Sequence, residues 1–295
     1  MSKVQDGVKK PLILFYDLES LPLQAYVWGC GENHIRHQQL LPNKNMWELI
    51  CITYCWNDDP VQIIKWTPEG GTEQMMKEFD LLLEKADHTI GKNSDRFDVK
   101  ILNAHRMLQG LPGNPSWSKY ADDLEKQMRR YFRLPSQSLD YISAQLGLGG
   151  KVKMELQDWI DIDRYFDVQK LLQDKRLDEI SINAVCNNQY GTSIDHILKV
   201  GKKSMDKMCF YGKKDTCDTR TLWNKLKKHF EPKLNLATFY NSATDIACRH
   251  CNGNNLIKWG TKASGKTLWQ TYQCKDCMCY AGRTPIKMTS KTRLS

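Results

Sequence analysis

The sequence predicts an α/β body followed by a small metal-binding unit, and three observations lead to this fold class. Strand-like apolar runs alternate with helical patterns in the first part of the chain. Five of the 11 cysteines crowd into the last 50 residues, where four of them form two CxxC pairs. Residues 246–295 also carry +8 of the net charge of +9. A length of 295 residues fits about two domains, and we place their boundary at residues 235–245.

The body begins with the pattern of a mixed sheet. The unbroken apolar run at 12–16 predicts a buried central strand. Further strands are expected at 49–56, 61–66 and 87–91, and helices at 73–86, 97–109, 138–146 and 205–230, with Pro232 ending the last helix. Residues 155–200 are polar and predict helices with loops. Three strands followed by a helix, a strand and a helix indicate a mixed sheet flanked by helices.

The two cysteine pairs predict a zinc ribbon at 246–295. Cys248 and Cys251 form the first pair and Cys274 and Cys277 the second, with 22 residues between them. Each CxxC turn directs two thiolates at one point, and two turns complete a tetrahedral shell around one Zn²⁺. The residues between the pairs indicate two short strands around a polar turn, a unit too small to fold without its metal. The alternatives are unpaired thiols without a metal, or an iron–sulfur cluster.

Two nearby residues, His250 and Cys279, are spare candidate ligands that we expect to stay outside the coordinating set. No stretch approaches the roughly 18 apolar residues of a membrane helix, and the first residues lack the pattern of a signal peptide. We therefore expect no membrane association and a reducing compartment, the cytoplasm, or the host cytoplasm for a viral protein.

Acidic residues gather at two places in the predicted body. Asp17 and Glu19 are two apart at the end of the first strand, so they share one face of the sheet and repel each other unless a cation lies between them. Solvated acids at a strand end are the alternative. Asp98 opens the helix after the 87–91 strand, where Phe97 would anchor the helix to the sheet and Asp95 would cap it.

A third feature lies in the long helix expected at 205–230. Tyr211 and Asp215 are four residues apart and so share a helix face. A partly buried tyrosine beside an exposed acid is the structural alternative. Taken in chain order, the three features are DxE on a first strand, NxxxFD opening a helix, and YxxxD on a late helix. The corresponding segments are FYDLES, GKNSDRFDVKILNAH and YGKKDTCDTRTLW, with LPSQSLDYISAQLGLGGK between the last two.

This pattern resembles the DnaQ-like 3′–5′ exonuclease superfamily, in its tyrosine-bearing DEDDy branch. It is most similar to the exonuclease domains of family B DNA polymerases and to stand-alone phage exonucleases, some of which carry a zinc ribbon. The resemblance covers residues 11–230 of the 1–235 body, and the poorly matching residues 155–205 would be a helical insertion. It implies an RNase H-like fold with a five-stranded sheet, and hydrolysis of DNA from a single-stranded or frayed 3′ end with two Mg²⁺ or Mn²⁺ ions.

The resemblance also assigns roles to the site residues. Asp17 would bridge both ions, Glu19 and Asp215 would hold the ion that activates water, and Asp98 would support the second ion through water. Tyr211 would orient or deprotonate the attacking water. Asn93 would either bind a nucleotide or cap a turn. Hard oxygen ligands suit Mg²⁺ or Mn²⁺, whereas zinc prefers the cysteines at the other end of the chain.

The basic ribbon is expected to bind nucleic acid or a replication protein such as a DNA polymerase. Lys258, Lys262 and Lys266 interleave with aromatic residues, of which Trp259 is a candidate for stacking on bases. The alternative is that the ribbon's aromatics, Trp269 and Tyr272 above all, form its own small core. Two other functions stay open: an RNA 3′–5′ exonuclease of the same fold, and a non-catalytic nucleic-acid-binding module.

Overall fold

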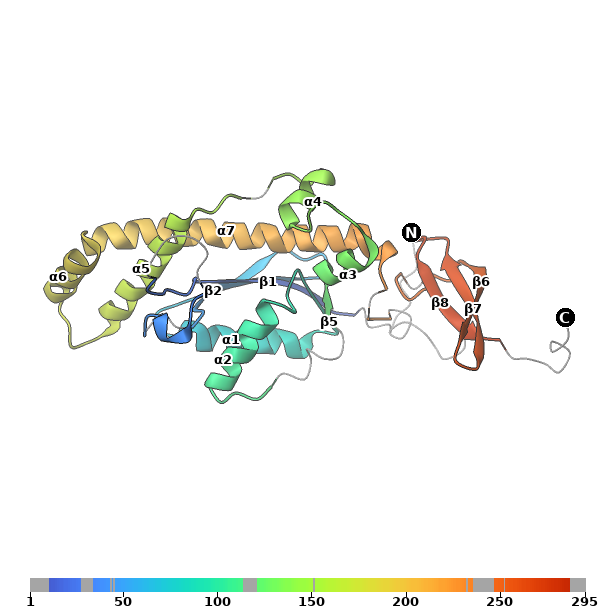
Figure 1. Ribbon diagram of the computed structural model, residues 1–295, viewed down its shortest axis with the longest axis horizontal. Helices are drawn as coiled ribbons and strands as arrows, with labels where there is room; N and C mark the ends of the chain where they lie inside the picture. Colours follow the sequence, from blue (N-terminus) through green and yellow to red (C-terminus); the bar gives the residue numbers. More distant parts are fainter. Residues whose placement is uncertain are drawn as a thin grey trace, which may run out of the picture.

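A computed structural model of the protein describes residues 11–27, 34–42, 44, 46–113, 121–150, 152–231, 233–235, 247–251 and 253–286. Figure 1 shows a sheet covered by helices, with a small ribbon of strands beyond it along the longest axis. The expected linker at 235–245 lies outside the described residues except for Asn235, as does Pro232. In the part of the chain that the structure describes, no helix is long and apolar enough to cross a membrane.

The body contains the mixed five-stranded sheet that was expected. Its strands are β1 (Ile13–Ser20), β2 (Leu49–Trp56), β3 (Gln62–Lys65), β4 (His88–Gly91) and β5 (Ala121–Asp123), in the order β3-β2-β1-β4-β5. β2 pairs antiparallel with both β1 and β3, whereas β4 runs parallel to β1 and to β5. The central position of β1 explains its apolar start, because both faces of that strand are covered.

The fifth strand, β5, has no apolar pattern, so the residues alone did not predict it. Its sequence is Ala-Asp-Asp, and aspartate is depleted in strands. Asp123 ends β5 and caps α3 (Leu124–Tyr131), because its carboxylate accepts the N–H groups of Glu125 at 2.8 Å and Lys126 at 3.3 Å. The strand therefore forms by pairing with β4, and the cap at Asp123 marks its end.

The predicted helices are confirmed, with one difference in length. They are α1 (Gly71–Lys85), α2 (Asp98–Leu108), α4 (Leu139–Gln145), α5 (Leu156–Gln173), α6 (Glu179–Tyr190) and α7 (Ile194–Leu226). Two short 3₁₀ turns are also present, η1 (His37–Gln39) between β1 and β2 and η3 (Lys227–His229) directly after α7. α7 begins at Ile194 rather than at 205, where Ser193 caps it by accepting the N–H of His196. Gly201, a poor helix former, interrupts the pattern between these first turns and residue 205.

Helices cover the two faces of the sheet differently, and this decides where the acids of β1 lie. α1 and α2 lie on one side of the sheet and α7 runs across the other (Figure 1). Leu14, Tyr16 and Leu18 of β1 join the core cluster that contains the buried residues of α1. Phe15 points the other way and joins the cluster of Leu222 of α7. Since side chains alternate along a strand, the face of Phe15 is also that of the next two odd-numbered residues.

The C-terminal ribbon has three antiparallel strands, one more than expected. β6 (Leu256–Ser264) and β7 (Thr267–Cys274) are the two strands predicted between the cysteine pairs. β8 (Tyr280–Pro285) pairs with β7 after the second pair. Its sequence, YAGRTP, contains a glycine and a proline, which are poor strand formers, so the pattern did not predict it.

Candidate functional site

Three of the predicted acids converge where β1 faces α7. Carboxylate oxygens of Asp17, Glu19 and Asp215 lie within 4.8 Å of one another. Asp17 and Glu19 share the α7 face of β1 with Phe15, and Asp215 is two helical turns before Leu222, which packs near Phe15. Strand and helix thus bring together residues almost 200 positions apart. Three carboxylates this close favour a cation between them, because they otherwise repel one another.

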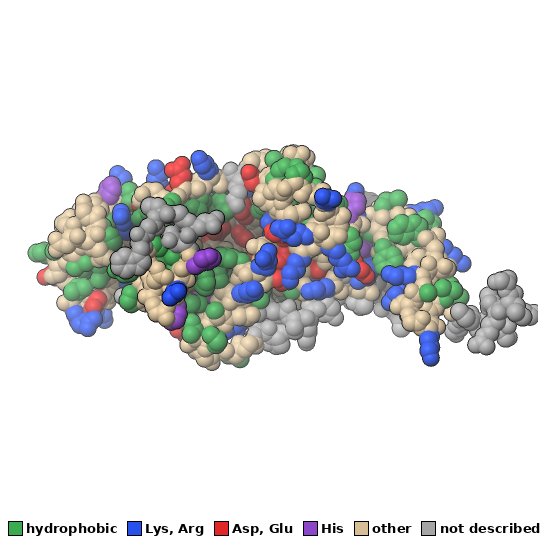
Figure 2. Space-filling view, viewed as in Figure 1, with side chains coloured by type: hydrophobic (Ala, Val, Ile, Leu, Met, Phe, Trp, Pro, Cys, Tyr) green, Lys and Arg blue, Asp and Glu red, His purple; other side chains and the backbone are tan. Residues whose placement is uncertain are grey.

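Tyr211 lies one turn before Asp215 and belongs to the same cluster. Burial, followed by the negative charges of Glu19, Asp215 and Asp17, raises the pKa of Tyr211 well above its usual range, and a hydrogen bond with Asp215 acts in the same direction. The phenol is half-buried and lines an open hollow of about 460 Å³ together with Asp140, Trp159 and residues 152–154. Figure 2 shows acidic side chains inside a hollow on this face of the body. Tyr211 is therefore placed between the acids and an accessible space.

A contact between α7 and β2 holds these residues in place, and sequence reasoning missed it. The Thr53 hydroxyl donates to the backbone oxygen of Gly212 at 3.0 Å and lies 2.7 Å from the Thr216 hydroxyl. A Cβ at Gly212 would lie 3.1 Å from the Thr53 side chain and 3.7 Å from that of Glu19. Glycine therefore lets the helix approach the sheet at this point. A glycine inside a predicted helix was the available signal.

Asp98 lies beside the three acids but not within their group. It is 3% exposed at the first position of α2. Burial raises the pKa of Asp98 to about 7, and the backbone N–H groups of Asp98 and Leu18 act against this increase. Leu18 stands between Asp17 and Glu19, so α2 brings Asp98 against β1 from the far side. Among the described residues, Asp98 Oδ1 has no hydrogen-bond partner.

The segment before α2 corrects two expectations. Phe97 does not anchor the helix to the sheet, because 39% of its surface is exposed. Asp95 does not cap the helix; it forms an ion pair with Lys126 at 2.5 Å, while α2 begins without a side-chain cap. The loop is held instead by Asp123, whose carboxylate accepts the N–H of Asn93 at 3.0 Å. The hydrogen bonds of Asp123, whose role sequence reasoning did not foresee, thus hold the loop that leads into α2.

Asn93 adopts a left-handed backbone conformation with φ of 58°, which asparagine tolerates better than most residues. This conformation and the bond to Asp123 agree with the turn-forming alternative for Asn93. Its side chain is half-buried.

The four oxygen-donor residues fit hard divalent cations. Carboxylates are the ligands that Mg²⁺ and Mn²⁺ take in proteins, and the donor set offers no sulfur or imidazole. The convergence of three carboxylates and the unpartnered oxygen of buried Asp98 both favour positive charge at this place. The site can therefore hold divalent metal beside an accessible hollow.

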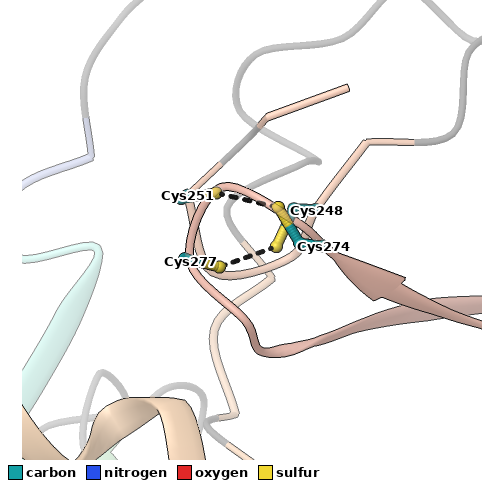
Figure 3. A group of neighbouring side chains, drawn as sticks. All are labelled: Cys248, Cys251, Cys274 and Cys277. Carbon is teal, nitrogen blue, oxygen red and sulfur yellow. Dashed lines mark hydrogen bonds between the residues drawn. The ribbon is translucent and has the colours of Figure 1, made fainter. Parts of the chain in front are cut away.

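The C-terminal cysteines form a second, chemically distinct cluster. The sulfur atoms of Cys248, Cys251, Cys274 and Cys277 lie within 4.8 Å of one another and converge in Figure 3. Cys248 is 3.5 Å from Cys277, and Cys251 is 3.6 Å from Cys274. Such a set of four thiolates fits a structural zinc ion.

Backbone N–H groups donate hydrogen bonds to both sulfur atoms of the first cysteine pair. The N–H of His250 donates to Cys248 Sγ and that of Gly253 to Cys251 Sγ, both at 3.4 Å. The two spare candidates stay outside the cluster of four. Cys279 is buried and donates to the Cys277 carbonyl at 3.5 Å. His250 is buried and lines a small pocket with residues of the body such as His88 and Trp223, and this burial lowers its pKa to about 4.

The predicted nucleic-acid contacts of the ribbon divide into two groups. Trp259 and Lys262 line a cleft of about 730 Å³ between the ribbon and the body. Lys258 and Lys266 do not line it. Trp259 is 59% exposed and lies outside the small cluster around Cys248 and Cys274, in which Tyr272 takes part. Trp269 packs under Arg283, whose guanidinium lies 4.4 Å from the ring centre.

Comparisons with known proteins find a distant likeness among solved structures. No family model matches the chain, and no curated protein matches it. Among solved structures, it is similar to the family B DNA polymerase from the hyperthermophilic archaeon Pyrobaculum calidifontis, with 12% identity and a TM-score of 0.39. The match covers 90% of this chain and 33% of that chain, so this chain spans about a third of the polymerase's length.

Proposed function

We propose that the protein is a metal-dependent 3′–5′ exonuclease of the DEDDy type that hydrolyses DNA. The observation that carries the proposal is the meeting of Asp17, Glu19 and Asp215 within 4.8 Å, with Tyr211 against them. Two divalent ions bound there supply an activated water and stabilise the charge that develops on the phosphodiester during in-line displacement.

Each residue has a role that its position supports. Asp17, Glu19 and Asp215 would hold the cations, and Asp98, which is hydrogen-bonded to the backbone of Leu18, would support the second cation through water. The Tyr211 hydroxyl lies at the edge of the hollow, where it orients the attacking water. Thr53, Gly212 and Thr216 fix the position of α7 relative to the sheet, and so that of Asp215 relative to Asp17 and Glu19.

The four cysteines bind one structural Zn²⁺, and the basic ribbon around them contacts nucleic acid. The charge pattern supports this part of the proposal, because residues 246–295 carry +8 while the remainder of the chain is close to neutral. We take residues 1–235 as the catalytic domain, with 155–205 as a helical insertion, and 246–295 as the ribbon. A DNA polymerase or another replication protein is the proposed protein partner.

The experiment incubates the protein with Mg²⁺ and matched DNA and RNA strands labelled at the 5′ end. A ladder that shortens from the 3′ end of DNA supports the proposal. Asp17→Asn and Asp215→Asn should each lower the rate at least about 100-fold, because each removes a charge that stabilises the transition state. Asp206→Asn is the matched control, since Asp206 is an exposed acid on the same helix.

Three outcomes would change the assignment. Cleavage that survives both substitutions rejects the proposed site. Degradation of RNA but not of DNA gives the same chemistry a different substrate. An inactive parent protein that still binds labelled strands favours a non-catalytic nucleic-acid-binding module, the second function open to a basic ribbon attached to a neutral body.

A further inference from the structure

The cleft between the body and the ribbon has walls from both parts of the molecule. Tyr131 of α3 and Lys228 and Phe230 at the end of α7 form the body side. Trp259 and Lys262 of β6 and Arg283 of β8 form the ribbon side. Figure 2 shows Lys and Arg side chains gathered on the body next to the ribbon. The volume of about 730 Å³ lies in the range of cavities that bury a ligand of drug-like size.

Basic side chains dominate this lining. Lys228, Arg249, Lys262 and Arg283 line the cleft, and Glu231 is the acid among the described lining residues. Glu231 lies 3.5 Å from Arg249, so it offsets one of the four positive charges. Lys228 and Lys262 are exposed and take part in no ion pair among the described residues. A concave surface with this charge attracts a polyanion.

Aromatic rings lie among the bases. Trp259 is 59% exposed and Tyr131 is 39% exposed, and both line the cleft together with Tyr280. Trp259 takes no part in the ribbon's own cluster around the cysteines, so folding does not explain its presence on β6. Exposed aromatic rings between phosphate-binding charges provide stacking platforms for unpaired bases.

The long helix connects this cleft to the acidic site. Thirteen residues separate Asp215 from Lys228, which corresponds to about 20 Å at 1.5 Å per residue. At the 3.4 Å spacing of stacked nucleotides in one strand, about six nucleotides span that distance. A strand with its 3′ end at the acids therefore reaches the cleft once it exceeds about six nucleotides.

We infer that this cleft binds single-stranded nucleic acid, with Lys228 and Lys262 contacting phosphates and Trp259 stacking on a base. The inference deepens the proposed function and rests on it, because the proposed function places the 3′ end of the strand at the acids. The volume suits one or two unpaired nucleotides rather than a duplex, and base faces are available for stacking only in an unpaired strand. The shared chemistry of backbone and base does not separate DNA from RNA, so the test contains both.

The test measures fluorescence anisotropy of the full-length protein with labelled 12-nucleotide dT and U strands in Mg²⁺-free, zinc-containing buffer. Trp259→Ala should weaken binding about 5- to 100-fold, and Trp259→Phe should restore most of it. The double variant Lys228→Ala/Lys262→Ala should lower the salt slope of log K by about 1.4, since each phosphate contact on a single strand contributes about 0.7. The inference is supported if the parent binds either strand and the cleft variants lose affinity and salt slope as expected.

The matched control is Lys203→Ala/Lys225→Ala, which removes two exposed lysines of α7 that lie outside the cleft. Its salt slope should stay close to that of the parent. Equal losses in the control and cleft variants, or tighter binding of a duplex than of a single strand, would overturn the inference. One zinc per chain in each variant verifies that the ribbon is folded.

A small substrate separates this inference from the proposed function. The p-nitrophenyl ester of thymidine 5′-monophosphate is too short to reach from the acids to the cleft. With Mg²⁺, its hydrolysis should be unchanged by the cleft substitutions. Absence of hydrolysis in the parent rejects the nuclease, whereas the anisotropy results decide on the cleft by themselves.

Discussion

At the residue scale, carboxylates serve two different purposes in this protein. Asp17, Glu19 and Asp215 are brought together within 4.8 Å of one another, an arrangement that suits cation binding. Asp122 of β5 is buried, and its hydrogen bonds engage it in the structure of the body. Its carboxylate accepts from His88 at 2.9 Å, Gln127 at 2.8 Å and the N–H of Lys233 at 2.9 Å. The three acids thus lie beside one another, whereas Asp122 is surrounded by hydrogen-bond donors.

Asp122→Asn should lower the free energy of unfolding by about 2–3 kcal/mol at pH 7, because charge-assisted bonds are lost inside the body. Burial raises the pKa of Asp122. The hydrogen bond with His88 and the charge of that ring outweigh this effect, together with the bonds from the Lys233 N–H and Gln127, so the pKa lies below its usual value of 3.8. The stability due to the carboxylate is therefore complete above about pH 4 and disappears as the pH falls further. Urea unfolding of both proteins at pH 7 and pH 3 measures this, and a constant difference would contradict it.

At the element scale, α7 assembles the site. One helix provides Tyr211 and Asp215 to the acids, Leu222 and Trp223 to the core, and leads directly to the cleft. The helix contacts the sheet through Thr53 of β2 and Gly212 and Thr216 of α7, which are buried or closely packed. The depth of α7 on β2 therefore sets the distance between Asp215 and the acids of β1.

Gly212→Ala tests this contact between α7 and β2. Alanine is the better helix former by about 1 kcal/mol, but its Cβ would lie 3.1 Å from the Thr53 side chain, so the helix must shift by a few tenths of an ångström. We expect a melting temperature close to that of the parent and an activity at least about 10-fold lower, because small displacements of catalytic groups are costly.

Gly201→Ala is the control on the same helix. Its Cβ would lie 2.3 Å from Tyr165 Cβ and 2.8 Å from the Asp161 carbonyl, away from the acids. It should lower stability by about 1–3 kcal/mol and preserve the activity of the folded fraction. Loss of activity in both variants in proportion to their stability would argue against a positioning role for Gly212.

At the scale of the whole molecule, two clusters of potential metal ligands are separated along the chain. The carboxylates of Asp17, Glu19 and Asp215 lie in the body, and the four cysteines lie in the ribbon. The ribbon's core is little more than Cys248, Cys274 and Ala281 with a few half-buried neighbours, and β6 is almost wholly exposed. We therefore expect the ribbon to depend on a bound metal for stability, whereas the body has its own large core.

Removal of zinc should unfold the ribbon and leave the body folded. Metal analysis should find one zinc per chain, and chelation should make residues 247–286 sensitive to protease. Hydrolysis of the small nucleotide ester should return to within about 2-fold when Mg²⁺ is added, while binding of long strands stays weak. Cys251→Ser should reproduce this loss and Cys217→Ser, outside the cluster, should not. A zinc-free preparation with all thiols titratable would contradict the ribbon assignment.

The local pattern of the sequence determined much of this protein. Apolar periodicity predicted β1 to β4 and most helices, since burial of apolar faces depends on spacing along the chain. Period two placed Asp17 and Glu19 on one face, and the CxxC spacing predicted a cluster of sulfurs. These features depend on residues a few positions apart.

Only the tertiary structure decided the rest, because it depends on contacts between distant residues. β5 and β8 exist through pairing with strands that were already formed, not through their own apolar pattern. Gly212 against Thr53, Asp98 against Leu18, and Lys228 opposite Lys262 are contacts or juxtapositions that no local pattern records. A sequence fixes which side chains are available at each position, but packing of helix on sheet decides which of them meet.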